Sequence, residues 1–146
     1  MKKKNNIIKT NLKYKKLHGK RRYKGNDWFR PVRRLSRSGV ILSKSYGRLT
    51  AEEIEAARRI IRSKALKKGR LLIRIKASIF LTKKPLQVRM GKGKGRISSH
   101  VAFVRPGKVL FELQGLRKQH SMLALLSGSK KLSLPVTIKY WSDLYK

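Results

Sequence analysis

Residues 89–95 form a stretch in which glycine alternates with lysine, and this stretch restricts the possible folds more than any other. It separates two apolar segments, and its three glycines let the backbone adopt positive φ angles and approach a partner closely. The cationic side chains of Arg89, Lys92 and Lys94 suit an anionic partner. The pattern predicts a loop that contacts an anion and that the rest of the chain holds in place.

The charge balance of the chain indicates which kind of anion is the partner. The chain carries 40 Lys and Arg against 6 Asp and Glu, a formal charge of +34, which opposes a compact state unless a polyanion neutralises it. No apolar run approaches the roughly 18 residues of a membrane span, and no basic helix with bulky aromatics on one face is evident. We therefore expect a nucleic-acid partner and no membrane partner. The absence of cysteine excludes disulfides and thiolate metal sites.

The 146 residues suffice for one ordinary domain, which we divide into a basic arm and a folded part. Residues 1–46 carry one acidic residue, Asp27, and show no sustained helical or strand period, so we expect a mostly irregular RNA-binding arm. Residues 47–146 are expected to form an α+β domain. The first residues resemble neither a secretory signal nor a transit peptide, so a protein working in an organelle is expected to be made there.

Residues 13–25 interleave Tyr14 and Tyr23 with a dense basic run. Such a segment suits threading between phosphates while the rings stack on exposed bases or sugars. A solvated, disordered tail is the alternative for an arm of this charge. Trp28 and Phe29 near Pro31 argue against a purely solvated tail, and favour docking on the chain's own domain or on RNA.

A helix is predicted over residues 51–67. Thr50 and Glu53 have the spacing of a capping box, and the glutamates at 52, 53 and 55 suit the positive end of the helix dipole better than acid–base catalysis. One face is predicted to pack and the other to meet phosphate. The packing face consists of Ile54, Ala57, Ile61 and Ala65, and the cations elsewhere include Arg58, Arg59 and Arg62.

The remaining pattern predicts an antiparallel sheet and a second helix. Strands are expected over residues 71–75, 85–89 and 135–141, and a helix over residues 116–131. Residues 100–105 and 108–113 are expected to pair as a hairpin around a turn at 106–107. The predicted fold is therefore α+β, an antiparallel sheet packed with two helices and preceded by a long basic N-terminal extension.

Catalytic and metal-binding patterns are absent from the sequence. His18, His100 and His120 have no carboxylate or cysteine partner at ligand spacing, so we predict no metal and no cofactor. The glycine–lysine stretch is not a P-loop, because the interval from Gly91 to Gly95 is wrong and no hydroxyl residue follows a Gly-Lys pair. We therefore predict that the protein is not an enzyme.

Several motifs in one order resemble those of a known family, the bacterial-type ribosomal large-subunit protein sixteen (the universal uL-sixteen family). The resemblance covers residues 13 to about 138. Its most specific part runs from Lys84-Pro85-Leu86 through Val88 to Gly95, and continues with Val101-Ala102 and residues 106–112. Residues 13–18 resemble the family's basic N-terminal motif, and residues 47–50 with 54–59 resemble its first-helix motif.

The resemblance implies a structural constituent of the large ribosomal subunit. Such a protein binds ribosomal RNA near the peptidyl transferase centre and the A-site, helps to position tRNA acceptor arms in the A and P sites, and joins the subunit late in assembly. Neighbouring ribosomal proteins are implied partners, and no homo-oligomer is expected. The expected ribosomal RNA contacts are Lys13, Tyr14, Lys15, Lys16, His18, Lys20, Arg21, Arg22, Lys24, Arg48, Arg58, Arg59 and Arg62. The expected functional-centre loop consists of Arg89, Met90, Gly91, Lys92, Gly93, Lys94 and Gly95.

Departures from the family pattern suggest a compartment. Residues 23–46 are longer and more basic than is usual, and Ser98-Ser99-His100 stands where an acidic residue and aromatics are common. With the Lys, Asn and Ile residues near the N-terminus, these changes favour an organelle-encoded protein of a mitochondrial ribosome, in the matrix; the alternative is the bacterial cytoplasm.

Two other classes share part of the pattern. A DNA-compacting nucleoid-type protein would share the charge, but it needs a dimerisation surface that the sequence does not suggest. A small RNA-modifying enzyme or nuclease would need more than Glu112, Asp143 and the scattered histidines.

Overall fold

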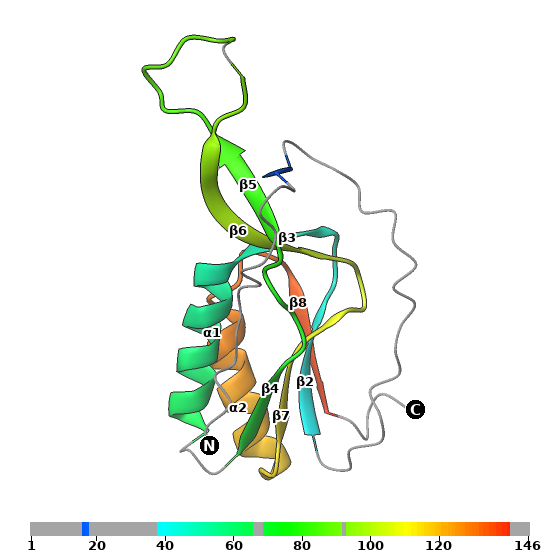
Figure 1. Cartoon of the computed structure of the whole chain (residues 1–146). Helices are drawn as coiled ribbons and strands as arrows, with labels where there is room; N and C mark the ends of the chain where they lie inside the picture. The colour runs from blue at the N-terminus through cyan, green and yellow to red at the C-terminus, as the bar shows by residue number, and fades with distance from the viewer. Residues whose placement is uncertain (1–15, 18–37, 66–68, 92, 141–146) are drawn as a thin grey trace.

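The computed structural model describes residues 16–17, 38–65, 69–91 and 93–140, which form two helices and eight strands in an α+β fold (Figure 1). The predicted fold class is confirmed for this part of the chain. The strands are β1 (Lys16–Leu17), β2 (Ser38–Ser43), β3 (Gly47–Thr50), β4 (Arg70–Ile73), β5 (Ile79–Lys83), β6 (Arg96–Val104), β7 (Val109–Gln114) and β8 (Val136–Tyr140). The helices are α1 (Ala51–Lys64) and α2 (Lys118–Ser129).

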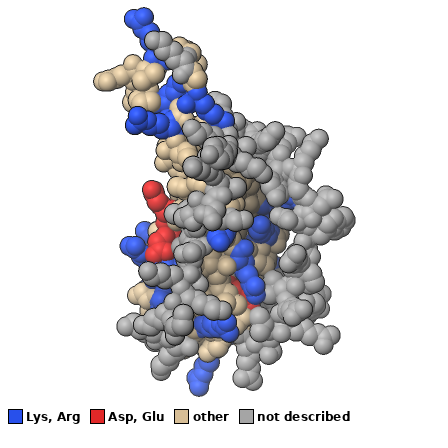
Figure 2. Space-filling view, viewed as in Figure 1, with Lys and Arg blue, Asp and Glu red and all other residues tan. Residues whose placement is uncertain are grey.

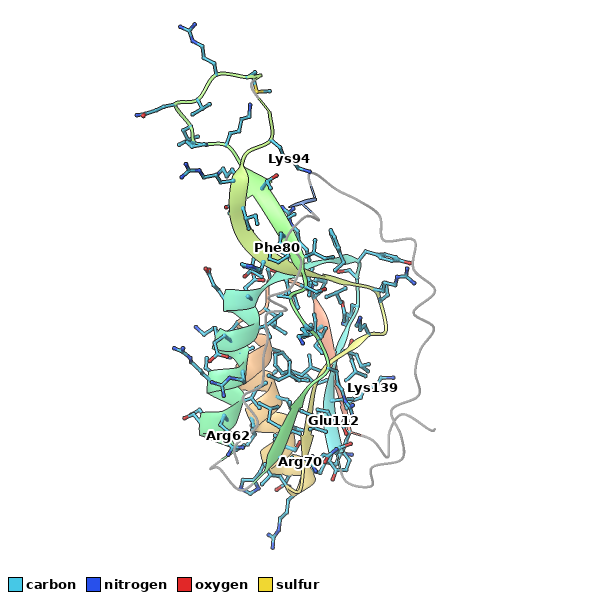
Figure 3. All side chains as sticks on the ribbon, viewed as in Figure 1. Arg62, Arg70, Phe80, Lys94, Glu112 and Lys139 are labelled. Carbon is cyan, nitrogen blue, oxygen red and sulfur yellow. The ribbon has the colours of Figure 1, made fainter. Side chains whose placement is uncertain are left out.

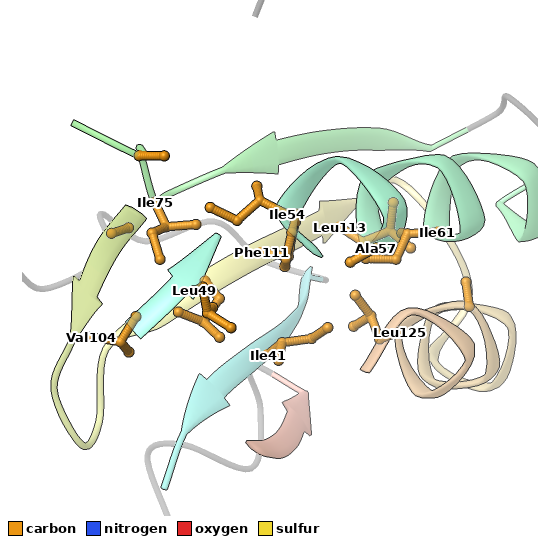
Figure 4. Packing of buried hydrophobic residues seen from close by; sticks show 14 of the residues in the cluster. Ile41, Leu49, Ile54, Ala57, Ile61, Ile75, Val104, Phe111, Leu113 and Leu125 are labelled. Carbon is orange, nitrogen blue, oxygen red and sulfur yellow. The ribbon is translucent and has the colours of Figure 1, made fainter. Parts of the chain in front are cut away.

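The core lies between one sheet and the two helices. This sheet has the order β4-β7-β2-β8 with antiparallel neighbours, and α1 and α2 lie together on one of its faces (Figure 1). Fully buried Ile41 from β2 and Phe111 and Leu113 from β7 pack in one cluster with Ile61 and Leu125 from the helices (Figure 4). Burial of these side chains is the main term favouring the fold.

Helix α1 begins where its capping box predicts. The Thr50 hydroxyl accepts a hydrogen bond from the Glu53 amide at 3.2 Å, and the Glu53 carboxylate accepts one from the Thr50 amide at 2.8 Å. The predicted packing face is confirmed, since Ile54, Ala57 and Ile61 are fully buried. Ala65, the fourth member of that face, is the C-cap, so the helix ends before the predicted residue 67.

Two glycines let α2 approach its neighbours closely. A Cβ atom on Gly39 of β2 would lie 2.4 Å from the Ser121 hydroxyl, and one on Gly128 would lie 2.3 Å from Cγ1 of Ile61. Gly128 weakens the last turn of α2 by its low helix propensity, yet it lies within the helix because it lets α1 pack against it.

The second sheet has the order β1-β5-β6-β3 and carries a protruding hairpin. β5 pairs antiparallel with β6, and the loop that joins them extends beyond the rest of the described domain (Figure 1). β1 pairs parallel with β5, with Lys16 opposite Phe80 and Leu17 opposite Leu81. The sheet thus holds the glycine–lysine stretch away from the core.

Two predicted strand assignments are wrong. The strand predicted over residues 85–89 is instead part of the protruding loop, and the strand in this region is β5, which precedes Pro85. The strands predicted at 100–105 and 108–113 correspond to β6 and β7 with shifted ends, but they do not pair with each other. β6 pairs with β3 and β5, whereas β7 pairs with β2 and β4.

The turn between β6 and β7 forms as predicted but passes the chain from one sheet to the other. The Lys108 amide donates a hydrogen bond to the Arg105 carbonyl at 3.2 Å, and Gly107 has a φ angle of +77°. Ser43 of β2 bonds this turn on both sides, accepting from the Gly107 amide at 2.8 Å and donating to the Lys108 carbonyl at 3.0 Å. These bonds join the start of β7 to β2 and thereby prevent a local hairpin.

The boundary predicted at residue 46 is too late. β2 lies between β7 and β8 in the core sheet, with Val40 and Ile41 fully buried, so residues 38–43 belong to the folded domain. Of residues 1–37, the structure describes only β1, and residues 1–15 and 18–37 lie outside the described part. The strands predicted at 71–75 and 135–141 and the helix predicted at 116–131 are confirmed as β4, β8 and α2 with shifted ends.

Candidate nucleic-acid interface

The loop between β5 and β6 uses its glycines in two different ways. Gly91 has φ of +97° and Gly93 has φ of +85°, conformations that side-chain-bearing residues rarely adopt. Gly95 instead allows a close approach, since a Cβ there would lie 2.6 Å from the Lys83 carbonyl oxygen. The predicted positive φ is therefore confirmed at Gly91 and Gly93.

The neck of the loop is fixed on both sides. Lys83 of β5 pairs with Arg96 of β6 at the end of the strand register. Just beyond, the Lys84 ammonium donates a hydrogen bond to the Gly91 carbonyl. The tip therefore extends from a defined base, which lowers the conformational entropy lost when a partner binds.

The tip exposes both cations and apolar side chains. Arg89 and Lys94 are exposed, and Lys and Arg side chains surround the protrusion in Figure 2. Leu86 and Met90 are 96% and 95% exposed. Lys92, the third predicted cation of the loop, lies outside the described residues. The described part of the loop therefore presents positive charge, which suits phosphates, together with exposed apolar surface, which phosphates would not cover.

β1 brings one part of the basic arm to the hairpin that carries this loop. Its backbone pairs with β5, so Lys16 lies in the sheet from which the loop protrudes. The other predicted arm contacts lie outside the described residues: Lys13, Tyr14, Lys15, His18, Lys20, Arg21, Arg22 and Lys24.

The predicted helix cations lie apart from the loop. Arg62, near the end of α1, is at the end of the domain opposite Lys94 and donates to the Gly69 carbonyl at 3.3 Å (Figure 3). Arg58 and Arg59 are both bonded to Glu55, at 2.6 and 3.0 Å. Arg48 is exposed on β3. The described cations of the predicted set therefore occupy more than one surface.

Glu55 is an ion-pair residue, which the sequence analysis missed by assigning it to capping and the helix dipole. The hydrogen bond from Arg58, with a further one from Arg59, lowers the pKa of its carboxyl from 4.5 to about 2, against the opposing effect of burial. The bond to Glu55 raises the pKa of Arg58. The i,i+3 and i,i+4 spacings on a helix were the signal for this pair.

A second ion pair, also missed, lies on β7. Glu112 is fully buried and accepts hydrogen bonds at 2.7 and 2.9 Å from Arg74, and one at 2.6 Å from Nε2 of the Gln114 side chain. The carboxylate is thus satisfied by fixed donors. Its bonding to neighbouring residues of the sheet accounts for a charged residue within the apolar sequence of β7.

The described histidines do not form a site. His100 packs edge-on against Phe80 with ring centroids 4.8 Å apart, and His120 is exposed at the start of α2. Within the part of the chain that the structure describes, no three His, Cys, Asp or Glu side chains are grouped to hold a metal ion. Neither of the two described helices is long and apolar enough to cross a bilayer.

Fold and surface together define a small, strongly basic α+β protein with a protruding cationic hairpin. A family described as ribosomal protein L16p/L10e matches residues 9–139. The chain therefore belongs to the L16p/L10e family of ribosomal proteins, which confirms the resemblance seen in the sequence. As a member, it is a structural ribosomal protein and not an enzyme.

Individual relatives agree with the family. The chain is 46% identical over 91 residues to the large ribosomal subunit protein uL16 of Buchnera aphidicola, covering 62% of this chain and 67% of the relative. It is 44% identical over 96 residues to the protein of that name from Psychrobacter arcticus, covering 66% and 70%. With the one from Xylella fastidiosa it is 38% identical over 122 residues, covering 84% and 88%.

Proposed function

We propose that this protein is a constituent of the large ribosomal subunit that binds ribosomal RNA near the peptidyl transferase centre and the A-site. There it helps to position the acceptor arms of tRNA in the A and P sites and to complete subunit assembly. The observation that carries this proposal is the β5–β6 hairpin, which holds an exposed loop bearing Arg89 and Lys94 beyond the domain. Membership of a ribosomal protein family supports the choice of ribosomal RNA over duplex DNA.

The proposed role needs charge and reach but no proton transfer. Lysine and arginine side chains contact phosphate oxygens and thereby fix the position and orientation of an RNA partner. Positive φ at Gly91 and Gly93 lets the loop backbone turn tightly between these cations. The arm, of which β1 pairs with the same hairpin, is proposed to bind ribosomal RNA beside it.

We further propose the mitochondrial matrix as the compartment, with the gene in the organelle. The basic segment 23–46 and the Lys, Asn and Ile residues near the N-terminus support this. The relatives described above are bacterial and fit the alternative, the bacterial cytoplasm. Finding the gene on a bacterial chromosome would decide for the alternative.

Sedimentation of the native protein tests the proposed function. We expect the protein to co-migrate with large ribosomal subunits and to remain bound at moderate salt. Lys92→Ala with Lys94→Ala should leave the isolated fold intact but slow subunit maturation or impair tRNA placement. The control is Lys130→Ala with Lys131→Ala, two exposed lysines after α2. Wild-type assembly and translation in the loop variant would refute the loop's role.

A further inference from the structure

A shallow pocket lies at the neck of the loop, where β5 ends and β6 begins. Its volume is about 320 Å³, at the small end of the roughly 300–1,000 Å³ range of ligand sites, so it suits a group of mononucleotide size. The residues that line it are Lys83, Lys84, Pro85, Leu86, Arg96, Ile97 and Ser98.

The cationic side of the pocket needs an anion. Lys83 and Arg96 stand directly opposite each other in the antiparallel register, and both are exposed. Like charges in directly opposed positions destabilise a strand pair. A phosphate placed between them would convert this repulsion into two charge-assisted contacts.

The apolar side of the pocket suits an apolar group and not a phosphate. Pro85, Leu86 and Ile97 contribute to its wall, and the last two are 96% and 44% exposed. Exposed apolar surface on a protruding neck gains free energy when a partner covers it. An apolar wall beside an anion site matches a nucleotide, which joins a flat ring to a phosphate. In a duplex that ring is stacked and shielded, so an unpaired nucleotide is required.

We propose that this pocket binds a single unpaired nucleotide of RNA. The base covers Leu86 and Ile97, and its phosphate lies between Lys83 and Arg96. Apolar side chains such as Leu and Ile contact the faces of unstacked bases where minor-groove proteins insert them between base steps. The hydrogen bond from Lys84 to Gly91 holds one wall of the pocket in place before the RNA arrives. The inference rests on the proposed RNA-binding function and adds the kind of nucleotide that the loop's neck recognises.

The test uses the full chain and three RNA hairpins of the same stem. One carries a single bulged 2-aminopurine, one an abasic residue at the bulge, and one is fully paired. We expect the first to bind about fivefold more tightly than the second, the ratio given by covering roughly 40 Å² of apolar surface at about 25 cal/mol per Å². A change in 2-aminopurine fluorescence should accompany binding. Leu86→Ser with Ile97→Ser should abolish this preference while leaving the salt dependence of binding unchanged.

The matched control is Leu123→Ser with Leu126→Ser, two exposed leucines on α2 that should retain the preference. Thermal unfolding checks that both variants fold. Equal binding of all three hairpins by the wild type would overturn the pocket and leave RNA binding intact. Loss of the preference in the control variant as well would also overturn the pocket. Failure to bind any of the three at low salt would overturn the proposed function itself.

Discussion

At the scale of single residues, the carboxylate of Glu55 makes the stability of α1 depend on pH. Its pKa is lowered from 4.5 to about 2, chiefly by the hydrogen bond from Arg58. The folded chain therefore binds this proton more weakly than the unfolded chain. The resulting stabilisation is fully present above pH 4.5, and it is lost as the pH falls toward about 2.

Glu55→Gln should lower the Tm near neutral pH, and its difference from the wild type should shrink to nothing between about pH 4.5 and pH 2. Circular dichroism melts across this range measure the effect. Glu52→Gln removes a charge from the same part of the helix without touching the ion pair with Arg58 and Arg59, so it is the control. A constant Tm difference at all pH values would contradict the ion pair's contribution.

At the scale of elements, the contact between α1 and α2 depends on the missing side chain of Gly128. In an exposed helix, Gly→Ala gains about 1 kcal/mol from helix propensity. Here the added methyl would lie 2.3 Å from Ile61, which is fully buried, so we expect Gly128→Ala to cost about 1–3 kcal/mol instead.

Urea unfolding of Gly128→Ala, Ile61→Ala and the double variant separates the two effects. The double variant should be less destabilised than the sum of the single changes, because Ile61→Ala makes room for the new methyl. Strict additivity would show that the two helices tolerate the methyl by moving apart.

Elements set by neighbouring residues could be predicted from the sequence, and elements set by distant ones could not. The start of α1 was predictable because Thr50 and Glu53 bond within one turn. The pairing of β6 was not, because Ser43, far away in sequence, holds the turn after Pro106. β2 was missed because its apolar run is short and lies in a basic context, although it is central to the core sheet.

The candidate site divides in the same way. The glycine conformations of the loop follow from local backbone chemistry and were predicted. The opposition of Lys83 and Arg96 depends on strand register, which does not follow from a sequence whose residues 85–89 predict a strand at the wrong place. The pairing of Arg58 and Arg59 with Glu55 follows from helical spacing, although the excess of positive charge in the sequence favours phosphate contacts for both arginines.

At the scale of the whole molecule, a charge of +34 makes RNA affinity steeply dependent on salt. If about ten cations each neutralise one phosphate, log affinity falls with log salt at a slope of roughly −7 to −9. The arm and the loop are both proposed to contact RNA phosphates, and β1 joins the arm to the hairpin that carries the loop. Two truncations, one ending before β1 and one after it, distinguish the effect of the arm's positive charge from the effect of its pairing with β5.

Removing residues 1–15 deletes six lysines but leaves β1, whereas removing residues 1–17 also deletes the strand that pairs with β5. Both truncated proteins should keep a cooperative thermal transition, because among the described residues the core cluster begins at Ile41. Both should show a shallower salt slope, by up to about 4–6 if every lost lysine met a phosphate. Only the longer truncation should speed hydrogen exchange in β5, since it leaves that edge unpaired. Loss of the thermal transition in both would instead place the arm within the folding unit, and equal exchange in β5 would show that β1 does not protect the hairpin.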